Sequence, residues 1–115
     1  MLAAGQHVHQ LTAIVDYNKW QATGRSQEVM ALEPLAAKWE AFGWHAQEID
    51  GHDLTAIHQA LVAARAETSK PSVIVAHTIK GKGVSFMEDD NNWHYRTPNA
   101  DELAAALAEL KEVQL

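Results

Sequence analysis

Hydrophobic residues along the chain form short runs that alternate with stretches in which they recur every three or four positions. Short runs rich in β-branched residues are typical of buried strands, and the wider spacing is typical of amphipathic helices. Strands are predicted over residues 11–16, 44–50 and 72–79. Helices are predicted over residues 1–8, 32–42, 54–69 and from 99 onward. The polar stretch 21–28 predicts a loop with a short helical turn after Ser26.

Residues with special backbone preferences stand at the expected helix boundaries. Pro34 fits a first helical turn, where its missing N–H costs nothing, and Gly43 is placed where the same helix would end. Asp53 is a candidate N-cap for the next helix, and Asn99 with Glu102 has the spacing of a capping box. The apolar face of the helix after Asp53 is predicted to comprise Leu54, Ile57, Leu61 and Ala64.

The alternation of strands and helices predicts an α/β fold with a parallel sheet and helical crossovers. Right-handed crossovers place the carboxyl ends of its strands on one edge. A chain of 115 residues fits one domain. The net charge of −6 argues against nucleic acid or an anionic membrane as a partner, and no apolar run is long enough to span a bilayer. The absence of cysteine excludes a disulfide framework and fits a cytoplasmic protein.

The stretch "VDYNKWQATG" begins as a strand and continues as a polar loop, with Tyr17 and Trp20 expected to be exposed. In an open α/β sheet, ligands bind at the carboxyl ends of strands. The amide oxygen of Asn18 and nearby backbone carbonyls are ligands that suit Mg²⁺, which prefers an octahedral set of oxygens. The structural alternative is an Asx turn that closes the strand.

The predicted loop over residues 80–98 is long for a compact domain and begins with "KGKG". Glycines let the backbone approach an anion and lysines supply positive charge, so Lys80 and Lys82 indicate a phosphate site; lysines solvated in a turn are the alternative. Farther along the same loop, His94 has the chemistry to hydrogen-bond a phosphate or transfer a proton, or is simply a surface histidine. His7 and His9 lack an evident third ligand for zinc.

The segments "LTAIVDYNKWQATG", "EVMALEPLAAKWEAFGW", "EIDGHDLTAI" and "AHTIKGKGVSFMEDDNNWH" resemble transketolases in order and spacing. The resemblance covers nearly the whole chain and places it in the carboxyl-terminal part of the diphosphate-binding domain. Deoxyxylulose-phosphate synthases share "DGHD" and "KGKG" but not "VSFMEDDNNWH". Split transketolases, which have separate amino- and carboxyl-terminal subunits, are most similar. The resemblance therefore implies a truncated thiamine diphosphate-binding fold that fills residues 1–115.

The family binds thiamine diphosphate through Mg²⁺ and transfers a two-carbon ketol unit from a ketose to an aldose, commonly as sugar phosphates. By resemblance, Asn18 would give its amide oxygen to Mg²⁺ and contact the diphosphate, and Trp20 would give its backbone carbonyl to the same ion. Lys80 would lie near the cofactor, and His94 would contact cofactor and substrate as the catalytic residue. Tyr95 departs from the family, which usually has glycine after the Trp-His pair.

No "GDG" occurs in the sequence, although in the family this segment supplies a carboxylate ligand to Mg²⁺. The pyrimidine-binding domain, with its activating glutamate, is also absent. The resemblance therefore implies a homo- or hetero-oligomer whose active site lies at an interface with a partner subunit or domain, and no activity from this polypeptide alone. Two alternatives remain open at this point: a non-catalytic α/β interaction module, and a general phosphate-binding domain that rests on "KGKG".

Overall fold

The computed structural model describes residues 1–112 and divides the chain into two compact units. We call residues Met1–Tyr17 with Met30–Thr78 the sheet unit, and Asn18–Val29 with the described residues from Ile79 onward the loop unit. Among the described residues, no helix is long and apolar enough to cross a membrane. The division falls inside the predicted single domain.

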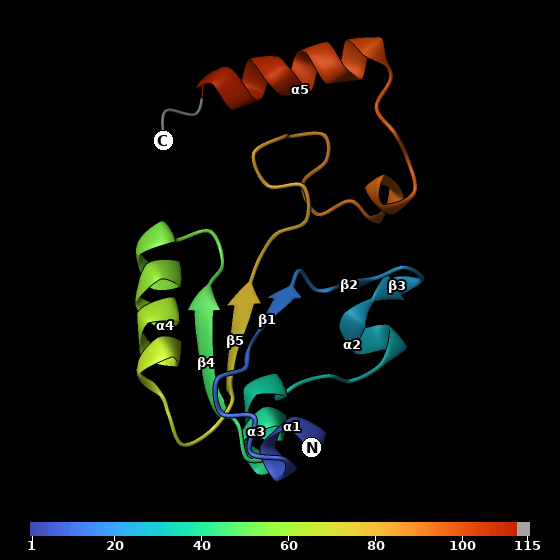
Figure 1. Ribbon diagram of the computed structural model, residues 1–115. Helices are drawn as coiled ribbons and strands as arrows, with labels where there is room; N and C mark the ends of the chain where they lie inside the picture. The colour runs from blue at the N-terminus through green and yellow to red at the C-terminus, as the bar shows by residue number, and fades with distance from the viewer. Residues whose placement is uncertain (113–115) are drawn as a thin grey trace. The chain divides into compact units, whose positions relative to one another are not determined.

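The sheet unit contains three parallel strands in the order β1–β5–β4 (Figure 1). They are β1 (Thr12–Tyr17), β4 (His45–Asp50) and β5 (Ser72–His77). The unit also contains α1 (Leu2–Gly5), α3 (Leu35–Ala41) and α4 (Leu54–Ala66). The register pairs Ile14 with Ile74 and Gln47 with Ile74, so β5 is the central strand. The parallel sheet with helical crossovers is therefore confirmed.

The core lies along β5, whose residues from Ser72 to Ala76 are all buried. Successive side chains of a strand point to opposite faces, so burial of every residue means that both faces of β5 are covered. Helices α3 and α4 each pack on β4 and β5. The chain crosses from β1 to β4 in one direction and returns to β5 in the other, so right-handed crossovers put the helices on opposite faces. The result is a helix–sheet–helix arrangement.

The N-cap prediction for α4 is confirmed, but the prediction of its packing face is wrong in part. The Asp53 side chain accepts hydrogen bonds from the backbone N–H groups of Thr55 and Ala56, at 2.8 Å and 3.2 Å. Ala60 and Ala64 are the buried residues of the helix and cluster with Ile74, whereas Leu54 is 70 % exposed. Small alanine side chains let the helix axis approach the sheet closely, so they define the packed stripe.

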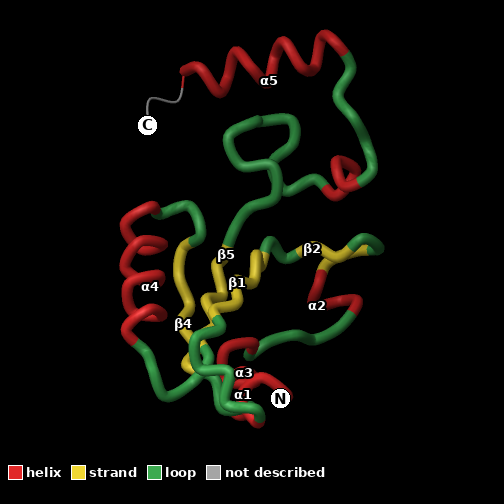
Figure 2. Tube along the Cα trace, viewed as in Figure 1, coloured by secondary structure: helices red, strands yellow, loops and turns green. Residues whose placement is uncertain are grey.

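The loop unit contains a short hairpin, a long loop and a terminal helix (Figure 2). Its elements are β2 (Trp20–Gln21), β3 (Gly24–Arg25), α2 (Ser26–Val29), the 3₁₀ turn η1 (Asn91–His94) and α5 (Ala100–Glu112). The helical turn after Ser26 is confirmed, whereas the hairpin stands where only loop was predicted. The capping box is confirmed, because Asn99 and Glu102 each accept the other's backbone N–H at 2.9 Å.

Candidate functional site

The predicted site residues Asn18, Trp20, Lys80 and His94 all belong to the loop unit. Asn18 follows β1 directly, and its Oδ1 atom accepts the backbone N–H of Trp20 at 2.9 Å. Between them Lys19 adopts a left-handed conformation with φ of 70°. This is the Asx turn that the sequence offered as the structural alternative. An amide oxygen has two lone pairs, so the turn leaves one of them for a second partner.

The turn at Asn18 leads straight into the hairpin of β2 and β3. Its ladder pairs Trp20 with Arg25 and Gln21 with Gly24. The backbone N–H of Ser26 donates to the Lys19 carbonyl at 2.8 Å, and Ser26 is only 2 % exposed. The hairpin and the buried Ser26 therefore hold the two ends of the segment 19–26 together.

The loop that begins with "KGKG" closes on itself. The backbone N–H of Asp89 donates to the Lys80 carbonyl at 2.8 Å. Gly81 and Gly83 have φ of 72° and 94°, in the left-handed region that favours glycine. A Cβ atom at Gly81 would lie 2.4 Å from the carbonyl oxygen of Met87. Loop closure therefore gives Gly81 a steric role that is independent of any bound anion.

The two lysines of this loop differ in how their charges are engaged. Lys82 lies 3.4 Å from the carboxylate of Glu88, which also accepts the backbone N–H of Gly83 at 3.0 Å. No such ion pair engages Lys80 within residues 1–112, and its side chain is half-buried. Of the two cations, Lys80 is the one whose charge remains available for an anion.

Asp89 joins the long loop to the hairpin. Its Oδ1 atom accepts the indole Nε1–H of Trp20 at 2.8 Å and an N–H of the Arg25 guanidinium at 2.6 Å. The second guanidinium nitrogen of Arg25 donates to the other carboxylate oxygen, and the Arg25 guanidinium carbon lies 3.8 Å from the Trp20 ring centroid. The hydrogen bonds from Arg25 and Trp20 hold the pKa of Asp89 below its usual range. The same ion pair raises the pKa of Arg25.

A second loop side chain reaches the same hairpin. The Asn91 side-chain nitrogen donates to the backbone carbonyls of Gln21 and Ala22, at 3.1 Å and 3.2 Å. Together with Asp89, it brings the segment of Asn18 and Trp20 and the loop of Lys80 into one hydrogen-bonded structure. Neither Asp89 nor Asn91 was predicted from the sequence, because "EDDNN" showed only a run of acids and amides.

His94 stands at the end of η1 in an aromatic stretch. Its ring meets that of Tyr95 edge to face, with the centroids 4.6 Å apart. The preceding Trp93 donates its indole N–H to the Phe86 carbonyl at 3.0 Å. Arg96 lies over the Trp93 ring, at 4.5 Å from its centroid, and forms an ion pair with Glu102. The structure therefore anchors Trp93 and Arg96, while His94 is exposed beside the Tyr95 ring.

Tyr17 is not exposed, contrary to the expectation from the sequence. It is 4 % exposed, and its hydroxyl group donates to Glu33 at 2.9 Å. Its ring also meets that of His77 edge to face, at 5.5 Å. A tyrosine can be buried when its hydroxyl group has a partner, and Glu33 provides that partner from a distant part of the sequence. Tyr17 therefore belongs to the sheet unit and not to the loop that follows it.

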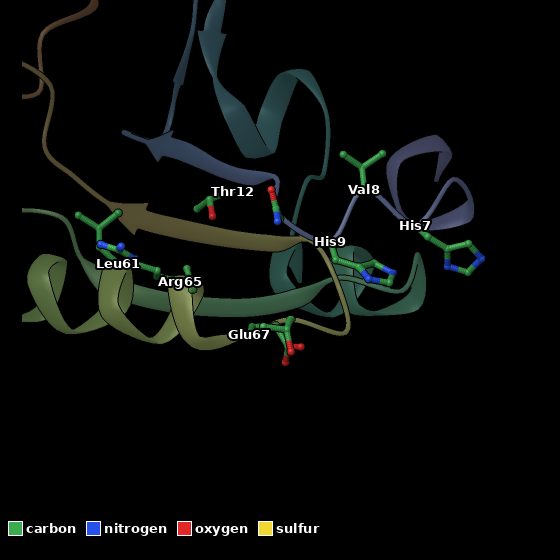
Figure 3. Close-up of a pocket in the computed structure, with 10 residues that line it drawn as sticks. His7, Val8, His9, Thr12, Leu61, Arg65 and Glu67 are labelled. Carbon is green, nitrogen blue, oxygen red and sulfur yellow. The ribbon is translucent and has the colours of Figure 1, made fainter.

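The sheet unit has a pocket of about 870 Å³ that contains none of the predicted site residues (Figure 3). Thr12 at the start of β1 and Leu61 and Arg65 of α4 line it, together with the segment from His7 to Gln10. Thr12 marks the amino end of its strand, whereas ligands in parallel sheets bind at the carboxyl ends. The pocket is therefore not the candidate site.

The chemistry of the donors fits a hard cation with an attached phosphate. Asn18 and the Trp20 backbone provide neutral oxygens, the kind of ligand that Mg²⁺ accepts beside phosphate and water. The positive charge of Lys80 is of the kind that suits a phosphate. Within residues 1–112, no group of three or more His, Asp or Glu side chains is placed to hold a metal ion. These residues therefore suit the neutral part of a Mg²⁺–diphosphate site.

Comparison with known proteins gives the same family along nearly the whole described chain. The profile of the transketolase thiamine diphosphate-binding domain matches residues 1–111. A 6-deoxy-6-sulfo-D-fructose transketolase subunit from a Clostridium species is 46 % identical over 112 residues, 97 % of this chain and 41 % of that protein. An apulose-4-phosphate transketolase subunit from Actinobacillus succinogenes is 38 % identical, over 97 % of this chain and 40 % of that protein.

The fold has a counterpart among solved structures. Transketolase from Campylobacter jejuni superposes with a TM-score of 0.88 at 26 % identity, over 96 % of this chain and 17 % of that protein. The chain spans about two fifths of the curated subunits it matches. The profile match, the identity to transketolase subunits and the shared fold agree: this chain belongs to the transketolase family and lies within its thiamine diphosphate-binding domain.

Proposed function

We propose that this chain contributes Mg²⁺ and diphosphate contacts to a transketolase that transfers a two-carbon ketol unit from a ketose to an aldose. The observation that carries the proposal is the Asx turn that joins Asn18 to Trp20. Asp89 connects this turn to the loop of Lys80, because its side chain accepts the Trp20 indole N–H and its backbone N–H donates to the Lys80 carbonyl. Thiamine diphosphate, when bound, supplies the carbanion chemistry of the transfer. The chain's own residues bind and orient it.

Each site residue has a distinct part in this proposal. The free lone pair of Asn18 Oδ1 and the Trp20 carbonyl would hold Mg²⁺, and Asn18 would also contact the diphosphate. Lys80 would balance the charge of the diphosphate. His94, an exposed imidazole, would hydrogen-bond the cofactor and the substrate and hold a proton near the reacting carbonyl.

The substrates and partner are proposed from the relatives. Their names refer to sugars that carry a phosphate or a sulfonate and to transketolase subunits. A sugar phosphate as substrate fits a site in which the Lys80 ammonium and the exposed His94 imidazole can each bind an anion. The proposed Mg²⁺ ligands, the Asn18 amide oxygen and the Trp20 carbonyl oxygen, are neutral, whereas Mg²⁺ commonly also takes a carboxylate. We therefore infer that a partner subunit or domain completes the active site at an interface.

Calorimetric titration of thiamine diphosphate into the purified chain, with and without Mg²⁺, tests the cofactor part of the proposal. We expect binding that requires Mg²⁺ and weakens at least about tenfold in Asn18→Ala, because even indirect partners of a metal contribute that much. Asn92→Ala is the matched control, since Asn92 lies in the same unit and its side chain donates to Asp90. Equal affinity in Asn18→Ala would contradict the role of Asn18.

A transfer assay tests the partner. We expect no ketol transfer between a ketose and an aldose phosphate with the chain, thiamine diphosphate and Mg²⁺ alone, and transfer once the completing subunit is added. Activity of the isolated chain would contradict the need for a partner.

The second candidate function is a non-catalytic module that docks to a transketolase. The observation in its favour is that no acidic or histidine cluster within residues 1–112 is placed to hold a metal. A folded wild-type chain that binds no thiamine diphosphate with Mg²⁺ would favour this function over the enzyme.

A further inference from the structure

Asp89 is an exposed residue that makes several hydrogen bonds within the loop unit. Its carboxylate accepts the Trp20 indole N–H and N–H groups from two of the three guanidinium nitrogens of Arg25, and its backbone N–H donates to the Lys80 carbonyl. The side chain is nevertheless 49 % exposed. Exposed ion pairs contribute little to folding stability, so stability alone does not account for this arrangement.

The backbone at Asp89 is also unusual. Its φ of 56° lies in the left-handed region, which disfavours side chains other than glycine, although aspartate tolerates it better than most. In this conformation one residue turns the chain back to Lys80 and directs its carboxylate toward the hairpin. A glycine there would adopt the same backbone but would lose every contact to Trp20 and Arg25.

Trp20 is held by contacts to both its backbone and its side chain. Asn18 Oδ1 holds the backbone N–H of Trp20, and Asp89 holds the far end of its side chain. The guanidinium group of Arg25 lies against the indole ring at 3.8 Å. The N–H group and the side chain of Trp20 are therefore both held, which restricts rotation of the residue that carries the carbonyl. One of these contacts comes from a carboxylate, Asp89, that does not itself belong to the proposed ligand set.

We propose that Asp89 is a positioning residue that fixes the Trp20 carbonyl for Mg²⁺ and sets its place relative to Lys80. This inference rests on the function proposed above. Asp89 would act on Mg²⁺ indirectly, by holding Trp20. Its role differs from that of Arg25, which binds the Asp89 carboxylate, because Asp89 is also hydrogen-bonded to the Lys80 backbone.

The test is the Mg²⁺ affinity of the full chain in the presence of thiamine diphosphate, measured by calorimetry. We expect Asp89→Ala to weaken Mg²⁺ binding by about 10- to 100-fold, the usual effect of removing a group that orients a metal ligand. Asp89→Asn should weaken it less, because its amide oxygen can still accept the Trp20 indole N–H. The matched control is Asp101→Ala, which removes the same charge from the exposed first turn of α5.

A double-mutant cycle separates positioning from general destabilisation. Trp20→Phe keeps the backbone carbonyl but removes the indole N–H, so it should weaken Mg²⁺ binding in the wild-type background and change it less than about twofold in Asp89→Ala. If the losses of Mg²⁺ affinity in the two single variants simply add in the double variant, the proposal that Asp89 acts through Trp20 is overturned. The indole N–H resonance of Trp20 gives a readout without ligand: it should shift in Asp89→Ala and not in Asp101→Ala.

The outcomes distinguish this inference from the function on which it rests. Wild-type binding that is retained in Asp89→Ala would overturn the role of Asp89 alone. No binding by a folded wild-type chain would overturn the proposed function, and the role of Asp89 with it. If Asp89→Ala does not fold, Asp89→Asn and Trp20→Phe decide: unchanged Mg²⁺ affinity in both would overturn the inference.

Discussion

Trp20 and Arg25 face each other across the short ladder of β2 and β3, with the guanidinium carbon 3.8 Å from the indole ring. The planar guanidinium both stacks on the ring and binds the Asp89 carboxylate through two nitrogens. Lysine has one ammonium group and no planar face, so it cannot do both. We therefore expect the hairpin to depend on arginine specifically and not only on a positive charge.

The first prediction is that Arg25→Lys loosens the hairpin while the charge is kept. The backbone N–H of Ser26, which donates to the Lys19 carbonyl, should exchange with solvent about two- to fivefold faster, because an exposed stacked pair contributes modestly. Amide hydrogen exchange measured by NMR is the test. Arg65→Lys on α4 is the control and should leave the rate at Ser26 unchanged. The same rate in Arg25→Lys would show that charge alone is sufficient.

The second prediction concerns Gly81. Gly81→Ala should destabilise the chain by roughly 1 to 3 kcal/mol, because the new Cβ atom would meet the Met87 carbonyl oxygen and the left-handed φ is strained for alanine. Urea unfolding measures the loss. Gly5→Ala is the matched control: beyond its chain neighbours and the backbone of its own helix, nothing lies within 4 Å of its Cβ position, and we expect no loss of stability. Equal stability of the two variants would mean that the loop shifts freely around Met87.

The third prediction concerns pH. Hydrogen bonds from the Ser69 hydroxyl and backbone N–H, both 2.6 Å long, lower the pKa of Glu67. A carboxylate with a lowered pKa stabilises the fold above its unfolded pKa, and this contribution is lost as the pH falls through the folded pKa. NMR titration should therefore show Glu67 ionised at lower pH than an ordinary glutamate. Ser69→Ala should move its pKa upward, and an unchanged pKa would contradict the role of Ser69.

Features that act within a few residues were predictable from the sequence. The cap at Asp53 and the box of Asn99 and Glu102 were confirmed because a cap bonds to backbone groups only two or three positions away. The parallel sheet followed from the alternation of strands and helices, which leaves few possible topologies. Local chemistry and chain connectivity were sufficient for these parts.

Features that depend on distant partners were not predictable. Trp20 and Asp89 are 69 positions apart, and neither residue signals the other in the sequence. Tyr17 was expected to be exposed because Glu33, the acceptor of its hydroxyl group, lies 16 positions away. Asn18, Lys80 and His94 were candidates from their residue chemistry, and the family resemblance gave them specific roles and added Trp20. Asp89, which connects Trp20 to Lys80, could not be predicted because its contacts depend on the loop closing on Lys80.

The last prediction compares two isoleucines that are register partners. Ile74 on β5 is 2 % exposed, whereas Ile14 beside it on β1 is 62 % exposed. Ile74→Ala should cost about 2 to 5 kcal/mol of unfolding free energy, because it removes buried contacts and leaves a cavity. Ile14→Ala should stay within about 0.5 kcal/mol of the wild type. Urea unfolding at several protein concentrations measures both. A large loss at Ile14 that grows with protein concentration would mean that another molecule covers β1 in solution, since only a buried isoleucine loses that much.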